Sequence, residues 1–519
     1  MQETANPENP APLAADERPL RHGVARAALA SGAAETATRV LMVALSIATA
    51  RALLPGQVGV LGLAVIVVGI VSLIAACCET AGVIGRYEGS DTQHAVAATL
   101  IRGLIVAALV AGVYLCLPVA PRLLAGAENA ESDLGYLIRI LLLIPVLELA
   151  ACYPRVLLQR KLDLAYIAGA TFLQAAAHVS LSVVLLWRGY GAAGIVWSSV
   201  LSTALGAAAV WLRVLGTRGP RWTGMPGASL RRNTLLGTAK VLAGGFVGYL
   251  NGRVDNLLVA GAIGPTAMSF YGMAWSASRM APQILGQALG FVLVPALAQI
   301  QTDTKRVERA LAESIRHSYL LVVPLSAALF VAAPSLVAVV LGAKWAPMVP
   351  CLRIMSITIL AAPLVSASNA ALVAAGRTHM TGLASLGHLI VLGILIVPLC
   401  RRWGILGAAY GDFCGVAVLT VTLCICTPSI RRALKHLALG TLLPTLAAGV
   451  ISGAAVWMAG AQVPDGILRL LAEGATMLGV YPAALWLVGG RTALSSLLSL
   501  VRTVVQPAPS APRVSPSHP

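Results

Sequence analysis

Residues Leu250–Met280 have the sequence LNGRVDNLLVAGAIGPTAMSFYGMAWSASRM. Two apolar runs meet here at a Gly-Pro corner, and three ionisable residues stand inside them: Arg253, Asp255 and Arg279. The chain on both sides of this stretch is almost wholly apolar. An ionised group is costly to keep where water cannot hydrate it, so these three residues require protein partners or a wet cavity.

The composition is that of a membrane protein. Of the 519 residues, 58% are hydrophobic and 11% are charged, whereas soluble domains carry about 25% charged residues. The apolar runs do not alternate with period two, so α-helices are the expected spanning elements. We predict an all-α polytopic membrane protein with about 14 transmembrane helices of about 20 residues, and about 12 or 13 remain compatible with the same runs. The expected spans are 24–49, 58–84, 94–117, 134–158, 164–187, 190–214, 235–262, 267–299, 315–341, 348–375, 380–400, 404–426, 437–459 and 466–488.

Positive charges are distributed unevenly between alternate loops. With the N-terminus placed in the cytoplasm and each segment counted with the span ends beside it, the inside segments hold 23 Lys and Arg, the outside segments hold 7, and the other 7 of the 37 lie within spans. This is the bias of the positive-inside rule, and it predicts that both termini are cytoplasmic. It also accounts for the net charge of +17 without a nucleic-acid partner.

The sequence contains a weak internal repeat. Two outside corners, ATARALLPGQVGVLGLA and LVAGAIGPTAMSFYGMA, align at an offset of 210 residues, so that Pro55 matches Pro265. A second pair of segments, GYGAAGIVW and RWGILGAAY, aligns at an offset of 213. Because six spans return the chain to its starting side, the offsets predict two six-helix lobes in a parallel pseudo-two-fold repeat, a transporter arrangement with substrate bound between the lobes.

The predicted organisation places two additional helices after the repeat. The segments are a disordered cytoplasmic tail (1–23), an N-terminal six-helix lobe (24–214), a basic cytoplasmic linker (215–234), a C-terminal six-helix lobe (235–426), two additional transmembrane helices (427–490) and a cytoplasmic tail (491–519).

Sequence motifs of enzymes are not found. The chain has no G-x-x-x-x-G-K-[ST] loop, no HExxH and no GxSxG, and the longest outside loop, about 118–133, is too short for a catalytic domain. No cysteine pair has metal-ligand spacing with a histidine partner. We therefore predict a secondary transporter rather than an enzyme, with no disulfide, no metal and no other cofactor.

Four pieces of the sequence carry a resemblance to a known family: ARALLPGQVGVLGLA, NGRVDNLLVAGAIGPTAMSFYGMAWSASRM, PALAQIQTDTKRVERA and LGAKWAPMVPCLRIMSI. Over about residues 24–430 the chain resembles the polysaccharide (lipid-linked oligosaccharide) flippases of bacterial envelopes. These flippases belong to the superfamily that also holds multidrug/toxin extruders and the lipid II flippase. The most specific piece of the resemblance runs from Leu341 to Leu352.

The resemblance implies both a fold and a substrate. It implies a V-shaped pair of six-helix lobes, a cationic central cavity, and alternating access driven by an ion or by the membrane potential. The implied substrate is an undecaprenyl-pyrophosphate-linked sugar repeat, moved from the cytoplasmic to the periplasmic leaflet of the bacterial inner membrane. We further expect a monomer that exchanges H⁺ or Na⁺ and associates with polysaccharide polymerase and export machinery. The glycan is not specified.

Two spans carry polar residues at helical spacing. In the first, Glu35 lies four residues before Arg39, the favourable order for a helical ion pair, and structural and functional roles remain open alternatives. The eighth span has one polar stripe, which consists of Ser276, Arg279, Gln283 and Gln287. No acidic residue lies on this stripe, so a purely structural Arg279 would need a distant carboxylate. Arg39, Arg279, Gln283 and Gln287 are our candidates for the substrate path.

The seventh span is harder to interpret. Arg253 and Asp255 are two residues apart, about 200° around a regular helix, so they are not expected to share a face. The resemblance assigns Arg253 to the cavity. Asp255 is either its structural neighbour or an ion-coupling carboxylate, and Asp412 in the twelfth span is likewise a candidate for an ion pair or for ion coupling. His388 is interpreted as a satisfied core histidine, with a proton site as the alternative.

Arginine suits the inferred substrate. A guanidinium group stays charged when it is desolvated and binds phosphate oxygens through a rigid fork. A multidrug or cation antiporter of the same superfamily is an alternative, but drug cations favour acidic cavities, and arginines outnumber obvious carboxylates in these spans. A membrane polysaccharide polymerase or ligase is a second alternative, which would need a larger outside loop.

The charge bias yields a topology test. We expect both termini and the 215–234 linker to be cytoplasmic, so single cysteines placed after Arg218 and after Gln506 should react with an impermeant maleimide only in opened cells. Labelling at either site in intact cells would reverse the orientation.

Overall fold

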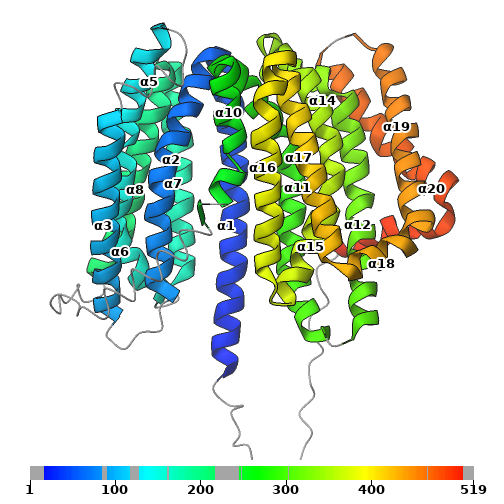
Figure 1. Ribbon diagram of the computed structural model, residues 1–519, viewed down its shortest axis with the longest axis horizontal. Coiled ribbons are helices and arrows are strands. Elements are labelled where there is room, and N and C mark those ends of the chain that lie inside the picture. The colour runs from blue at the N-terminus through cyan, green and yellow to red at the C-terminus, as the bar shows by residue number, and fades with distance from the viewer. Residues whose placement is uncertain are drawn as a thin grey trace, which may run out of the picture. The chain divides into compact units, whose positions relative to one another are not determined.

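The computed structural model describes residues 17–84, 91–116, 128–160, 163–216, 245–246, 248–301, 303–464 and 466–505. Every regular element in these ranges is a helix (Figure 1). Ten helical segments among them are long and apolar enough to cross a membrane, and Gly103–Cys116 and Val254–Ile263 are shorter apolar helices. The predicted all-α polytopic class is therefore confirmed, whereas the count of about 14 spans is not. Of the predicted tails, residues 1–16 and 506–519 lie outside the described residues, whereas residues 17–23 and 491–505 are helical.

Contacts along the chain divide it into two compact units. Unit 1 comprises residues 1–53, 64–122 and 128–246, and unit 2 comprises residues 54–63, 123–127 and 247–519. The helices of the first half of the chain are α1 (Glu17–Ala52), α2 (Pro55–Ile84), α3 (Asp91–Cys116), α5 (Glu128–Leu141), α6 (Leu143–Arg160), α7 (Leu164–Trp187) and α8 (Gly191–Gly216). The helices of the second half are α10 (Val254–Ile263), α11 (Pro265–Ile300), α12 (Thr304–Val331), α13 (Ala333–Leu336), α14 (Val349–Thr358), α15 (Ala362–Ala374), α16 (Thr378–Trp403), α17 (Ile405–Cys426), α18 (Pro428–Leu437), α19 (Leu443–Ala461) and α20 (Ile467–Val505).

In unit 1, α6, α7 and α8 pack around an apolar core and are joined by side-chain hydrogen bonds. The Tyr153 and Trp211 rings stack with centroids 6.0 Å apart. Trp211 Nε1 donates to the Ala150 carbonyl oxygen at 2.8 Å, and Tyr166 Oη donates to the Ala209 carbonyl oxygen at 2.8 Å. Because hydrocarbon offers no hydrogen bonds, such side-chain bonds to backbone carbonyls help to align helices inside the unit.

Unit 2 contains the last two long helices within its core. Leu297 of α11, Leu311 and Ile315 of α12, Ala370 of α15 and Leu485 of α20 belong to one buried cluster. In addition, α12 packs against α18, α19 and α20. The helices beyond the predicted repeat are therefore integral to this unit.

Two predicted spans in the second half are interrupted in the structure. The predicted span 315–341 contains the end of α12 at Val331, because Pro334 has no N–H to continue the helical bonding. The predicted span 348–375 consists of α14, a 3₁₀ turn at Ile359–Ala361 and α15. Apolar composition alone does not reveal such breaks, since both sides of each break are equally hydrophobic.

The Leu341–Leu352 piece contributes a buried anchor. Trp345 lies in a 3₁₀ turn, Ala343–Met348, and is completely buried. Its ring meets Phe270 of α11 edge to face, with centroids 5.6 Å apart. Burial of a whole indole against an aromatic partner stabilises packing strongly, so the most specific part of the resemblance is a packing element in this structure.

A second buried contact joins the C-terminal helices. Glu473 of α20 is 2% exposed, and it accepts hydrogen bonds from Arg469 Nε at 3.1 Å and from Ser335 Oγ of α13 at 3.0 Å. Gly460 of α19 leaves the space that the carboxylate occupies, since an added Cβ would lie 2.7 Å from Glu473 Oε1. The carboxylate thus ties α13, α19 and α20 together inside unit 2.

The two predicted corners lie against each other within unit 2. Pro55 begins α2 and Pro265 begins α11, and residues 54–63 belong to the same unit as α11. A Cβ added to Gly59 would overlap the carbonyl group of Pro265. The absence of a side chain at Gly59 therefore permits this approach, and the two prolines lie at the same end of their helices, as the repeat requires.

This close approach predicts an asymmetry between two glycines. Gly59→Ala should lower the midpoint of thermal unfolding in detergent, because overpacking costs about 1–3 kcal/mol. Gly261→Ala is the matched control, since nothing lies within 4 Å of its added Cβ. Equal midpoints for the two variants would contradict the contact.

Candidate functional site

An ion pair inside unit 2 links α11 to α17. Arg279 Nη2 donates to Asp412 Oδ1 at 2.9 Å and to Oδ2 at 3.1 Å. The Asp412 side chain is 3% exposed and the Arg279 side chain is 30% exposed. The Trp275 ring, one turn earlier on α11, lies with its centroid 5.2 Å from Arg279 Cζ. The guanidinium group is thus held by a carboxylate and by an aromatic ring while part of it stays accessible.

A glycine row on α17 brings this helix close to α16. Gly407, Gly411 and Gly415 are spaced by four and therefore share one face. A Cβ on Gly407 would overlap the Leu399 carbonyl group, and one on Gly415 would lie 2.7 Å from His388 Cδ2. Small residues let helix backbones approach in membranes. The row also leaves the space that the His388 ring fills.

A second carboxylate, Asp255 of α10, is buried near the ion pair. Its Oδ1 accepts from the Asn256 backbone N–H at 2.8 Å and from Asn256 Nδ2 at 3.1 Å, and its Oδ2 accepts from Tyr271 Oη at 2.9 Å. It is 3% exposed. Asp255 lies within electrostatic range of both Arg279 and Asp412.

His388 of α16 completes the polar cluster. It is 6% exposed, and its Nδ1 lies 2.6 Å from Asn251 Oδ1. The other ring nitrogen, Nε2, has no hydrogen-bond partner among the described residues. The interpretation of a satisfied core histidine is therefore correct for one nitrogen only.

The cluster holds two carboxylates and one guanidinium group. Arg279 balances one negative charge, so ionisation of both Asp255 and Asp412 leaves one charge in excess. Burial makes such an excess expensive unless a proton or another cation joins the site. The arrangement can therefore hold an anion at the accessible part of Arg279 and a small cation at the carboxylates.

The remaining candidates of the second half are placed as follows. Arg253 is exposed at the N-terminal end of α10, and Gln283 is exposed on α11. Gln287 lies on α11, but its side chain is outside the described part of the chain. Asp255 is buried and Arg253 is exposed, so the two side chains do not lie on one face. The helix is also interrupted by a turn at Gly252-Arg253, where Arg253 has φ −142°.

The pair predicted in the first span is present in unit 1. Arg39 Nη2 lies 3.1 Å from Glu35 Oε1 on α1, and the two side chains are 33% and 60% exposed. The spacing of four residues places them one turn apart, as expected. The geometry is compatible with either of the roles left open for this pair.

Sequence reasoning missed Tyr271 and Asn251. Tyr271 follows Pro265 by six residues and Asp255 precedes it by ten, so a helical hairpin brings them within reach of each other. The similar distances of Asp255 and Tyr271 from the Gly-Pro corner were the signal in the sequence that could have predicted this contact. Asn251 meets His388 across 137 residues, and no periodicity connects residues so far apart.

Comparisons with known proteins give the family. A family model described as polysaccharide biosynthesis protein matches residues 48–350, more than half of the chain. Lipopolysaccharide biosynthesis protein WzxC of Escherichia coli strain K12 is 27% identical over 130 residues, which are 25% of this chain and 26% of that protein. The match thus spans about a quarter of the length of the curated relative.

Solved structures share the fold. The lipid II flippase MurJ in an inward closed conformation superimposes with a TM-score of 0.71 at 12% identity, covering 88% of this chain and 98% of that one. An inward-facing multidrug resistance MATE transporter of the MOP superfamily has a TM-score of 0.62 at 15% identity, covering 76% and 95%. These similar proteins are flippases and transporters rather than enzymes. The chain belongs to the polysaccharide biosynthesis protein family and is a multi-pass membrane protein with the fold of these solved structures.

Proposed function

We propose that the protein is a flippase for undecaprenyl-pyrophosphate-linked polysaccharide repeat units. It would move them from the cytoplasmic to the periplasmic leaflet of the bacterial inner membrane by alternating access of its two six-helix lobes. The family match and the fold shared with the lipid II flippase MurJ support this proposal. The similarity to lipopolysaccharide biosynthesis protein WzxC supports the proposal that the transported units are used to build an envelope polysaccharide.

The observation that carries the proposal is the geometry of Arg279. Asp412 engages a single nitrogen of the guanidinium group, Nη2, with both of its oxygens. No further hydrogen bond from the Arg279 side chain is found among the described residues, so Nε and Nη1 remain available there. A pyrophosphate oxygen accepts from such donors through charge-assisted bonds. Asp412 therefore orients the group without using all of its donors.

The driving force is compatible with this direction of transport. Moving about two negative charges outward across an inside-negative potential of about 100 mV releases roughly 4–5 kcal/mol. The excess carboxylate near Arg279 offers a site for a coupling ion, H⁺ or Na⁺, and we assign that role to Asp255. Arg39, Arg253, Gln283 and Gln287 are proposed as further parts of the substrate path, with polymerase and export machinery as partners downstream.

A multidrug or cation antiporter is the second candidate. Asp255 and Asp412 are buried carboxylates, a type of group that suits cationic drugs, and a MATE transporter shares the fold. The cation that occupies Asp412 in this structure is the protein's own Arg279, however, and its remaining donors favour an anion. The flippase is therefore the better-supported function.

The first test separates transport from folding at Arg279. Loss of Arg279 alone leaves Asp412 buried without its partner, which costs about 3–5 kcal/mol. Arg279→Leu combined with Asp412→Leu removes both charges, so we expect normal protein levels in the membrane. Polymer production in a deletion strain should nevertheless fall about ten- to a hundredfold, since a charge-assisted contact contributes about 1.5–3 kcal/mol. Arg279→Lys should also transport poorly, because lysine keeps the charge without the fork.

The matched control is a second buried ion pair of unit 2. Arg469→Leu combined with Glu473→Leu changes a similar pair that lies outside the proposed path, and it should retain polymer production. Near-normal polymer from the Arg279 and Asp412 double variant at matched protein levels would defeat the proposed role of Arg279.

The second test concerns coupling at Asp255. Asp255→Asn keeps the shape of the side chain and removes its charge, so transport into inside-out vesicles should lose its dependence on a proton or sodium gradient. Tyr271→Phe removes one hydrogen bond to the same carboxylate, keeps the charge, and should keep the dependence. An unchanged ion dependence in Asp255→Asn would make Asp255 a structural residue.

A further inference from the structure

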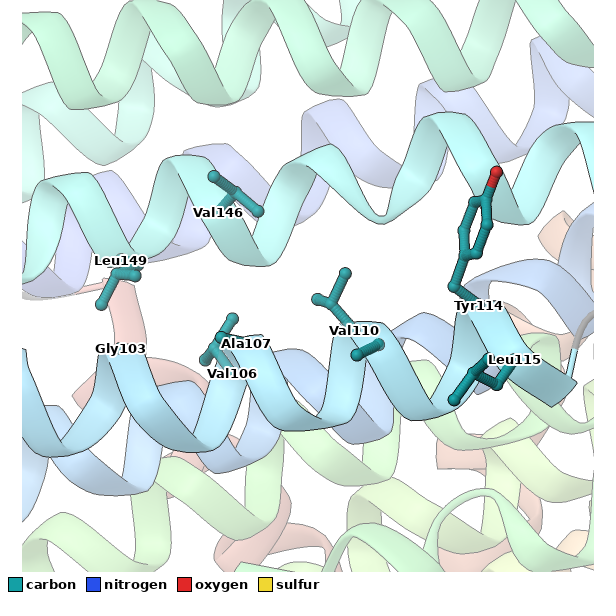
Figure 2. Close-up of a pocket in the computed structure, with 9 residues that line it drawn as sticks. Gly103, Val106, Ala107, Val110, Tyr114, Leu115, Val146 and Leu149 are labelled. Carbon is teal, nitrogen blue, oxygen red and sulfur yellow. The ribbon is translucent and has the colours of Figure 1, made fainter.

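An apolar groove runs between α3 and α6 of unit 1. It encloses about 600 Å³, within the range of about 300–1,000 Å³ typical of ligand sites. Figure 2 shows Gly103 and Leu149 at one end and Tyr114 at the other. Val106, Val110 and Val146 also line it.

Small residues on α3 create the groove. A Cβ on Gly103 would lie 3.7 Å from Leu149 Cδ2, so the two helices are in contact at this end. Further along the same face of α3, Ala107 and Ala111 also line the groove and provide only methyl groups to fill the space. The groove is therefore a consequence of the α3 sequence.

The dimensions suit one hydrocarbon chain. Tyr114 lies 11 residues after Gly103, a separation of about 17 Å along the helix. Half of the hydrocarbon core of a bilayer is about 15 Å thick. The groove is thus about as long as one leaflet is thick, which matches a phospholipid acyl chain and is far shorter than a long isoprenoid chain.

A cationic group stands at the tyrosine end. Arg139 of α5 is exposed, and its Cζ lies 6.0 Å from the centroid of the Tyr114 ring. Within the part of the chain that the structure describes, no carboxylate forms an ion pair with Arg139. Tyrosine is enriched at the membrane interface, where headgroups lie. The groove therefore joins an apolar slot to a guanidinium group at headgroup depth.

These two features together select a ligand. A hydrocarbon chain gains no hydrophobic free energy by leaving the bilayer for a groove, so the slot contributes packing alone. Preference among lipids then comes from Arg139, whose guanidinium group binds phosphate oxygens. A zwitterionic lipid also carries a headgroup cation that repels Arg139, whereas an anionic lipid has no such cation. The geometry points to a binding site for an anionic phospholipid, with one acyl chain in the α3–α6 groove and its headgroup on Arg139. This site is independent of the transported substrate.

The test uses the full chain in nanodiscs of equal phosphatidylglycerol and phosphatidylcholine, followed by native mass spectrometry of the retained lipids. The unaltered protein should retain phosphatidylglycerol preferentially. Arg139→Gln should reduce this preference about threefold to tenfold, because it removes a charge-assisted contact, and Arg139→Lys should restore part of it. Ala107→Phe should lower lipid retention by filling the groove. Leu104→Phe is its matched control, since Leu104 is 75% exposed and does not line the groove.

Three outcomes would overturn the site. They are equal retention of the two phospholipids by the unaltered protein, an unchanged preference in Arg139→Gln, and displacement of phosphatidylglycerol by added undecaprenyl phosphate. The last result would assign the groove to an isoprenoid tail instead. If Ala107→Phe does not accumulate, Arg139→Gln still decides, because Arg139 is exposed and its replacement leaves the groove packing intact.

Discussion

A guanidinium group inside a hydrocarbon layer must be neutralised or hydrated, and the bond from Arg279 to Asp412 meets this requirement in unit 2. The pair joins α11 to α17, while the glycine row of α17 brings α16 close beside it. Asp255 and Tyr271 add α10 to the same polar cluster. Such a pair contributes little net stability compared with apolar packing, yet breaking it is expensive. Asp412 is thus the distant carboxylate that a structural Arg279 requires, while the exposed part of the guanidinium group is what the proposed contact with substrate requires.

Much of the fold was predictable because hydrocarbon imposes a simple rule on sequence. A spanning helix needs about 20 apolar residues, so the spans at 164–187 and 190–214 correspond closely to α7 and α8. The rule fails where a helix is interrupted without a change in polarity. The 3₁₀ turn at Ile359–Ala361 lies in apolar surroundings, and hydropathy does not register it. The turn at Gly252-Arg253 lies beside Asn251 and Asp255, but the run around these residues is long and apolar enough to be taken for one continuous span.

The charged members of the candidate site were predictable from the sequence, but their pairings were not. Arg279, Asp255 and Asp412 each stood out as ionisable residues in apolar runs. Helical periodicity relates residues within one helix, so it connected Glu35 with Arg39 correctly. It had no means of connecting Arg279 with Asp412, because that contact depends on how α11 and α17 pack. The unpaired nitrogen of His388 was equally invisible, since its surroundings come from several helices.

The Arg279–Asp412 pair also has a consequence for biosynthesis. Arg469 and Glu473 lie four residues apart on α20, so their charges can neutralise each other as soon as that turn forms. Arg279 and Asp412 are separated by 133 residues. At about 5–20 residues per second, the ribosome adds Asp412 about 7–27 s after Arg279. During that interval the arginine must be accommodated by water, by headgroups or by the insertion machinery, so α11 completes its burial only after α17 has been delivered. The order and speed of translation are therefore part of how this unit assembles.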